Sequence, residues 1–201
     1  MKFLIKSASF IFHPLWMPFA GSLFYFLVTP RFFPLPLIQA KLLAVAITTI
    51  FIPVVFYFLL KNLGKADSIF LKDVNERRWP LFFYCLLIGL NLFKILNIYN
   101  YPSLYYYFVG MLFSILAAFI LALLKVKVSL HMLGLSGIFM FVIALSIYFH
   151  LNLIYAIAFL MAALGITATS RLHYKAHSWI ELIIGFFIGL VPQIIVLNFW
   201  L

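Results

Sequence analysis

The stretch VSLHMLGLSGIFMFVIALSIYFHLNLIYAIAFLMAALGITATS, residues 128–170, decides the fold because it contains no Asp, Glu, Lys or Arg. As one helix it would be about 64 Å long, roughly twice the hydrocarbon core of a bilayer. The chain must therefore fold back, and the polar break His150-Leu151-Asn152 is the predicted turn. This stretch alone predicts two membrane-spanning helices.

The rest of the chain has the same character. Of its 201 residues, 67% are hydrophobic and 9% are charged, whereas roughly a quarter of a soluble domain is charged. A helix satisfies its own backbone hydrogen bonds, as a bilayer requires. We predict an all-α, polytopic transmembrane helical bundle in a single integral domain, 1–201. Its about seven spans are centred in 8–29, 38–60, 81–98, 104–124, 132–149, 153–169 and 180–200.

Seven spans place the N-terminus and the loops after spans two, four and six on one face of the membrane. That face holds most of the basic residues and all four acidic ones, Asp67, Asp73, Glu76 and Glu181. The opposite face has only Arg31, Lys41 and Lys94. The positive-inside rule would make the charged face cytoplasmic. Alternatively, several of its cations bind an anion, and the two interpretations are compatible.

Three polar segments share the charged face. The first, residues 72–80, reads Lys-Asp-Val-Asn-Glu-Arg-Arg-Trp-Pro and precedes the third span. The second contains Lys127, Ser129 and His131 at the entrance to the fifth span. A helix N-terminus favours an anion, and histidine adds a titratable base. The alternative is that Ser129 only caps the helix and His131 faces the headgroups.

The third segment, residues 170–181, reads Ser-Arg-Leu-His-Tyr-Lys-Ala-His-Ser-Trp-Ile-Glu and precedes the seventh span. His177 and Glu181 are four residues apart, so on a helix the carboxylate can reach the imidazole and fix its tautomer. A histidine prepared in this way can act as a nucleophile. The alternative is a capping box of Ser178 and Glu181, in which the carboxylate serves the backbone.

Together, the three segments carry the parts of a phosphoryl-transfer site. Arginines and lysine can bind a phosphoryl group, one histidine can attack phosphorus, and a second can protonate the leaving oxygen. No metal or other cofactor is needed for this chemistry.

The same residues resemble the type-2 phosphatidic acid phosphatase superfamily, whose motifs are Lys-x6-Arg-Pro, Pro-Ser-Gly-His and Ser-Arg-x5-His-x3-Asp. The third motif matches at Ser170, Arg171 and His177, with Glu181 in place of Asp. The second keeps Ser129 and His131, with Val128 and Leu130 replacing Pro and Gly. The first is looser, with Lys72, Arg78 and Pro80 present and the spacing changed.

The resemblance implies a membrane lipid phosphatase with His177 as the nucleophile that forms a phosphohistidine. Glu181 would orient it, and His131 would protonate the leaving lipid alcohol. The expected phosphate ligands are Lys72, Arg78 or its neighbour Arg77, Lys127, Ser129, Ser170 and Arg171. The substrate would be a phosphomonoester or pyrophosphate of a lipid, and we expect the protein in a bacterial plasma (inner) membrane.

Two other functions remain open from the sequence. In one, His173, His177 and Glu181 line a continuous helical face and bind a metal, as in a metal-dependent membrane hydrolase. In the other, the protein binds or transports lipids without turnover. The net charge of +10 does not indicate nucleic-acid binding, because the basic residues lie at membrane boundaries. Anionic membrane lipids are the expected partners.

Overall fold

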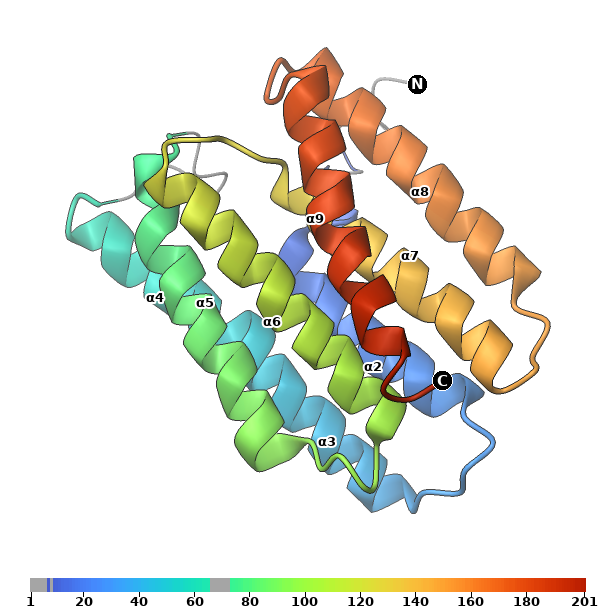
Figure 1. The fold of residues 1–201 in the computed structure, drawn as a ribbon. Coiled ribbons are helices and arrows are strands. Elements are labelled where there is room, and N and C mark those ends of the chain that lie inside the picture. The colour runs from blue at the N-terminus through green and yellow to red at the C-terminus, as the bar shows by residue number, and fades with distance from the viewer. Residues whose placement is uncertain (1–6, 8, 66–72) are drawn as a thin grey trace.

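The computed structural model describes residues 7, 9–65 and 73–201 and shows a bundle of long helices joined by short loops (Figure 1). No strand occurs among these residues. The elements are η1 (Pro14–Trp16), α2 (Met17–Val28), α3 (Leu35–Ala46), η2 (Ile47–Phe51), α4 (Ile52–Asn62), η3 (Asn75–Arg77), α5 (Arg78–Leu90), η4 (Asn91–Ile95), α6 (Pro102–Leu123), α7 (Leu130–Tyr148), α8 (Ile154–His173) and α9 (Trp179–Leu197).

Within the described chain, 6 helices are long and apolar enough to cross a membrane. Two of them are composite, because η2 joins α3 to α4 and η3 and η4 flank α5, and the other four are α6, α7, α8 and α9. The predicted turn is present: α7 ends at Tyr148, α8 begins at Ile154, and His150 has a positive φ of 53°. The chain is an all-α, multi-pass integral membrane protein.

The first predicted span, 8–29, differs from the other six because it is not one helix. His13 is extended, with ψ at 137°, and the apolar helix that follows, Pro14–Val28, is shorter than the six spans. Proline lacks the N–H of a helix interior and disfavours helical backbone in the residue before it. Pro14 therefore separates a short N-terminal piece from α2.

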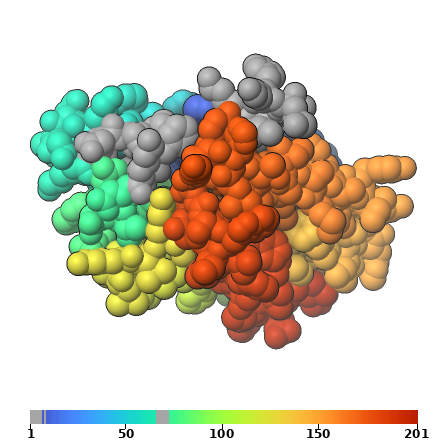
Figure 2. Space-filling model, turned by 90° about the horizontal axis from the view of Figure 1, so that it is seen from above, coloured from blue at the N-terminus to red at the C-terminus, as the bar shows by residue number. Residues whose placement is uncertain are grey.

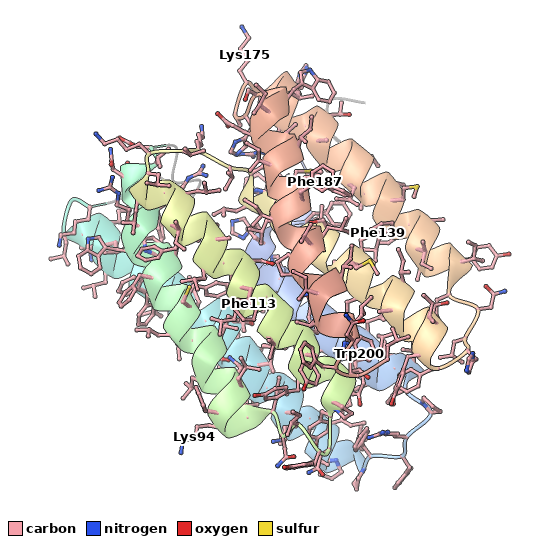
Figure 3. The ribbon with its side chains drawn as sticks, viewed as in Figure 1. Lys94, Phe113, Phe139, Lys175, Phe187 and Trp200 are labelled. Carbon is pink, nitrogen blue, oxygen red and sulfur yellow. The ribbon has the colours of Figure 1, made fainter. Side chains whose placement is uncertain are left out.

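The outer surface of the bundle is apolar, as a lipid environment requires. Phe113 and Phe187 lie about midway along their helices, and each side chain is more than half exposed (Figure 3). Lys94 and Lys175 project from opposite ends of the molecule in the same view. Charged side chains at the ends and apolar side chains between them match a bilayer with two polar boundaries.

Two glycines bring α9 close to α7. A Cβ at Gly185 would lie 2.5 Å from the carbonyl oxygen of Ser129, and one at Gly189 would lie 2.1 Å from that of Leu133. Small residues spaced by four allow helix backbones to approach each other in membranes. This contact fixes the start of α9, which carries Glu181, against the start of α7, which carries His131.

Candidate active site

The three polar segments predicted to meet lie at one end of the bundle, where the loops before α5, α7 and α9 are found (Figure 1). Figure 2 looks down on this end and shows the loop before α7, in yellow, beside the loop before α9, in orange. Three hydrogen bonds join the segments directly. Arg77 Nη1 donates to the Val128 carbonyl at 2.7 Å, Lys127 Nζ to the Ala176 carbonyl at 3.0 Å, and Ser129 N–H to the Glu181 carbonyl at 3.0 Å.

His177 and Glu181 form the centre of this arrangement. Helix α8 ends at His173, Lys175 takes a positive φ of 49°, and α9 begins at Trp179. Ser178 caps α9 by accepting the Glu181 N–H at 3.3 Å. The Glu181 carboxylate is nevertheless turned to the imidazole, and its Oε2 accepts from Nδ1 of His177 at 2.5 Å. The cap and the carboxylate–histidine pair therefore coexist.

Burial and neighbouring cations favour the neutral form of His177. Burial, together with the nearby positive charges of Arg77, Arg171 and Lys127, lowers the pKa of His177 below its ordinary value. Burial also lowers the pKa of Lys127, and Glu181 opposes that shift. In a neutral imidazole whose Nδ1–H donates a hydrogen bond to a carboxylate, Nε2 carries the free lone pair. That nitrogen is therefore available to accept a proton or to act as a nucleophile.

Two arginines, Arg77 and Arg171, line the cavity at the candidate site. Arg77 and Arg171 are 4% and 7% exposed, and both line a cavity that His177 also lines. Arg78 is not among the lining residues, and its Nε lies 3.4 Å from the Ala122 carbonyl at the end of α6. Lys72, the other cation predicted from this segment, lies outside the described residues.

His131 lines the same cavity, and the two predicted serines lie beside it. Ser129 Oγ accepts the Met132 N–H at 3.4 Å, so this hydroxyl caps α7. Ser170 Oγ lies 2.9 Å from Ser9 Oγ. Neither serine lines the cavity. The structure therefore places both hydroxyls in the supporting framework of the site.

Sequence reasoning missed the contribution of the segment before α2. Ser9 is buried, its carbonyl oxygen lies 2.9 Å from His131 Nε2, and its Oγ accepts from Arg171 Nη1 at 3.2 Å. His13 lines the cavity and packs edge-on against His131, with the ring centroids 5.3 Å apart. The only local signal was the His13-Pro14 interruption of an apolar run.

The cavity has a volume of about 160 Å³, and two kinds of residue line it. Its polar end is formed by the side chains of His13, Arg77, His131, Arg171 and His177. Most of the other lining residues are apolar, and those from α4, α5 and α6 include Val54, Phe56, Leu81, Phe83, Met111 and Ile115. A lining of this composition suits an amphiphile with an anionic head and an apolar chain.

The metal-binding alternative required one continuous helix through His173, His177 and Glu181. The helix instead ends at His173, whose side chain is exposed, whereas His177 is buried beyond the turn. Within the described residues, no three His, Cys, Asp or Glu side chains are grouped so as to hold a metal ion.

No family model, curated protein or solved structure matches this chain.

Proposed function

We propose that the protein is a membrane-embedded lipid phosphatase of the type-2 phosphatidic acid phosphatase kind, acting without a metal through a phosphohistidine. The observation that carries the proposal is the His177–Glu181 pair, which sits with two buried arginines at the polar end of an otherwise apolar cavity. A phosphoryl group bound at this end of the cavity would lie within reach of two guanidinium groups, which form strong, charge-assisted hydrogen bonds to phosphate oxygens.

In the first chemical step, Nε2 of His177 attacks phosphorus and the bond to the lipid oxygen breaks. Arg77 and Arg171 line the cavity, and in the proposal their guanidinium groups bind the phosphoryl oxygens through charge-assisted hydrogen bonds. Glu181 accepts Nδ1–H and stabilises the positive charge that develops on the ring. The products of this step are a phosphohistidine and a lipid oxygen that needs a proton.

His131 is the residue proposed to supply that proton. A carbonyl oxygen only accepts hydrogen bonds, so Nε2 of His131 carries a proton and donates a hydrogen bond to the Ser9 carbonyl oxygen. In the charged ring, Nδ1–H is therefore the donor left for the leaving oxygen. In the second step the same nitrogen takes a proton from water, the hydroxide oxygen bonds to phosphorus, and the P–N bond breaks to release phosphate.

The apolar part of the cavity supports a lipid as the substrate. A soluble phosphate ester would place nothing against the helix side chains that line this part, whereas an apolar chain would gain roughly 25 cal/mol per Å² of surface removed from water. The head of the substrate is then a phosphomonoester or a pyrophosphate, and the same arginines serve both.

The proposal is tested on purified protein in detergent with a chelator and a panel of lipid phosphates and pyrophosphates. It predicts phosphate release that survives EDTA, is inhibited by orthovanadate, and is lost in His177→Ala. His173→Ala is the matched control, because this exposed histidine stands four residues before His177, and it should retain activity. Release that EDTA abolishes would favour the metal-dependent hydrolase, and binding without release would favour a lipid-binding or transport protein.

A further inference from the structure

The segment before α2 reaches the site through two residues that belong to none of the three polar segments. Ser9 contacts His131 with its carbonyl and Arg171 with its hydroxyl. Four residues later, His13 packs against His131 and lines the cavity. The segment thus touches the proposed proton donor from two sides.

The hydrogen bonding of His13 fixes which of its nitrogens carries the proton. Its side chain caps η1, with Nδ1 accepting the Leu15 N–H at 3.4 Å. An imidazole nitrogen that accepts a hydrogen bond is unprotonated, so the ring is neutral and its proton is on Nε2. His13 is therefore a neutral donor, held by the backbone of the element that follows it.

The position of His13 identifies the substrate atom within its reach. The residues that follow it, Pro14, Leu15, Met17 and Pro18, line the cavity's apolar part, whereas His131 and Arg171 mark its polar end. His13 thus connects the two sets of lining residues, because its ring packs against His131 and Pro14 follows it in the chain. In a bound lipid phosphate, the oxygen that joins phosphorus to the chain lies between these two sets.

We propose that His13 is a further catalytic residue, a neutral hydrogen-bond donor to the bridging oxygen of a lipid phosphate. This inference rests on the proposed function. As the P–O bond breaks, negative charge develops on this oxygen, and a fixed donor stabilises the charge before the proton from His131 arrives. His13 transfers no proton, because its Nδ1 stays engaged with Leu15 and its Nε2–H only donates.

The kinetic test compares His13→Phe, His13→Gln and the control His150→Phe, whose histidine lies in the turn at the far end of α7. With a lipid alcohol as the leaving group, His13→Phe should lower kcat/KM by about 10²-fold, the loss typical of one oxyanion donor. With p-nitrophenyl phosphate, whose leaving oxygen needs little stabilisation, the loss should be small. His13→Gln, which keeps an N–H donor, should recover part of the activity. The pH profile of kcat/KM should keep its acid limb, assigned to His177, and its basic limb, assigned to the proton donor His131.

A second measurement, of lipid phosphate binding, does not depend on turnover. In the His177→Ala background, adding His13→Phe should weaken binding of the same lipid phosphate by about tenfold, the size of one hydrogen bond to a charged group. If wild-type protein releases no phosphate while this measurement shows the loss, the phosphatase proposal fails and the binding role of His13 stands.

The inference is overturned by an equal loss with both leaving groups, by unchanged binding in the His177→Ala background, or by disappearance of the basic limb in His13→Gln. An equal loss of kcat/KM with both leaving groups would mean that His13 has only a structural role. Loss of the basic limb of the pH profile would mean that His13 is the proton donor. Thermal unfolding of each variant in detergent identifies those that fail to fold, and His13→Gln then carries the test.

Discussion

Nδ1 of His177 donates to Oε2 of Glu181 at 2.5 Å, across the turn that separates α8 from α9. The turn ends α8 before His177, and the Ser178 cap begins α9, so the Glu181 carboxylate in the first turn of α9 faces back toward the imidazole. The pair lies beside cations from all three polar segments. Its geometry suggests the first prediction.

Glu181→Gln should lower kcat by about 10- to 100-fold, the usual cost of losing the partner that orients a functional histidine. The amide retains the size of the side chain but supplies no negative charge to stabilise the ring. Glu181→Asp, which keeps the charge, should lose less. Steady-state kinetics on one lipid phosphate checks the order of the three proteins, and equal activity of Glu181→Gln and wild type would contradict it.

Arg77 and Arg78 provide a test between neighbours. Arg77→Lys should reduce kcat/KM by about 10²-fold or more, because lysine cannot reproduce the forked hydrogen bonds of a guanidinium. Arg78→Lys should have little effect, since Arg78 lies beside the Ala122 carbonyl and outside the cavity. The reverse order would contradict the assignment of Arg77 to the phosphate site.

The pH profile should reflect the cations around His177. Its pKa lies below the ordinary value, so the ring remains neutral, and nucleophilic, at a pH where a free histidine is half protonated. The acid limb of kcat/KM should therefore fall below pH ~6.5. Lys127→Met removes one of the positive charges that lower this pKa and should move the limb to higher pH. Lys175→Met, at the tip of the loop, is the control, and equal profiles for both variants would contradict the assignment.

The contact between α7 and α9 should tolerate no side chain at Gly189. Gly189→Ala would force the backbones apart, because its Cβ would lie 2.1 Å from the Leu133 carbonyl oxygen. We expect a destabilisation of about 1–3 kcal/mol, as for other overpacked interiors. Gly165→Ala is the matched control, since a Cβ there meets nothing within 4 Å. Thermal unfolding in detergent compares the two, and equal midpoints would refute the packing argument.

The sequence predicted those features that depend on local pattern. Apolar stretches predicted the 6 long helices that the described residues form, and His150 marked the turn between α7 and α8. Counting spans placed the polar segments at one end of the bundle, where the structure finds them. The spacing of His177 and Glu181 predicted a contact that the structure contains.

Features that depend on long-range packing could not be predicted from the sequence. Ser9 meets Ser170 across 161 positions of the chain, and no local spacing indicates such a contact. The choice of Arg77 over Arg78 depends on how η3 enters α5, which the altered motif spacing did not reveal. The four-residue spacing of Gly185 and Gly189 was visible in the sequence, but only the structure identifies its partners, Ser129 and Leu133.

The most direct test of the account is to look for phosphate on His177. Wild-type protein is mixed with a lipid phosphate in EDTA and quenched in alkali, which preserves phosphohistidine, and its peptides are analysed by mass spectrometry. The account predicts a phosphoryl group on the peptide that contains His177. This group should disappear when the protein is left in buffer without substrate before the quench, and it should be absent from His177→Ala. Phosphate released with no such adduct, or an adduct on His131 or His173 in its place, would contradict it.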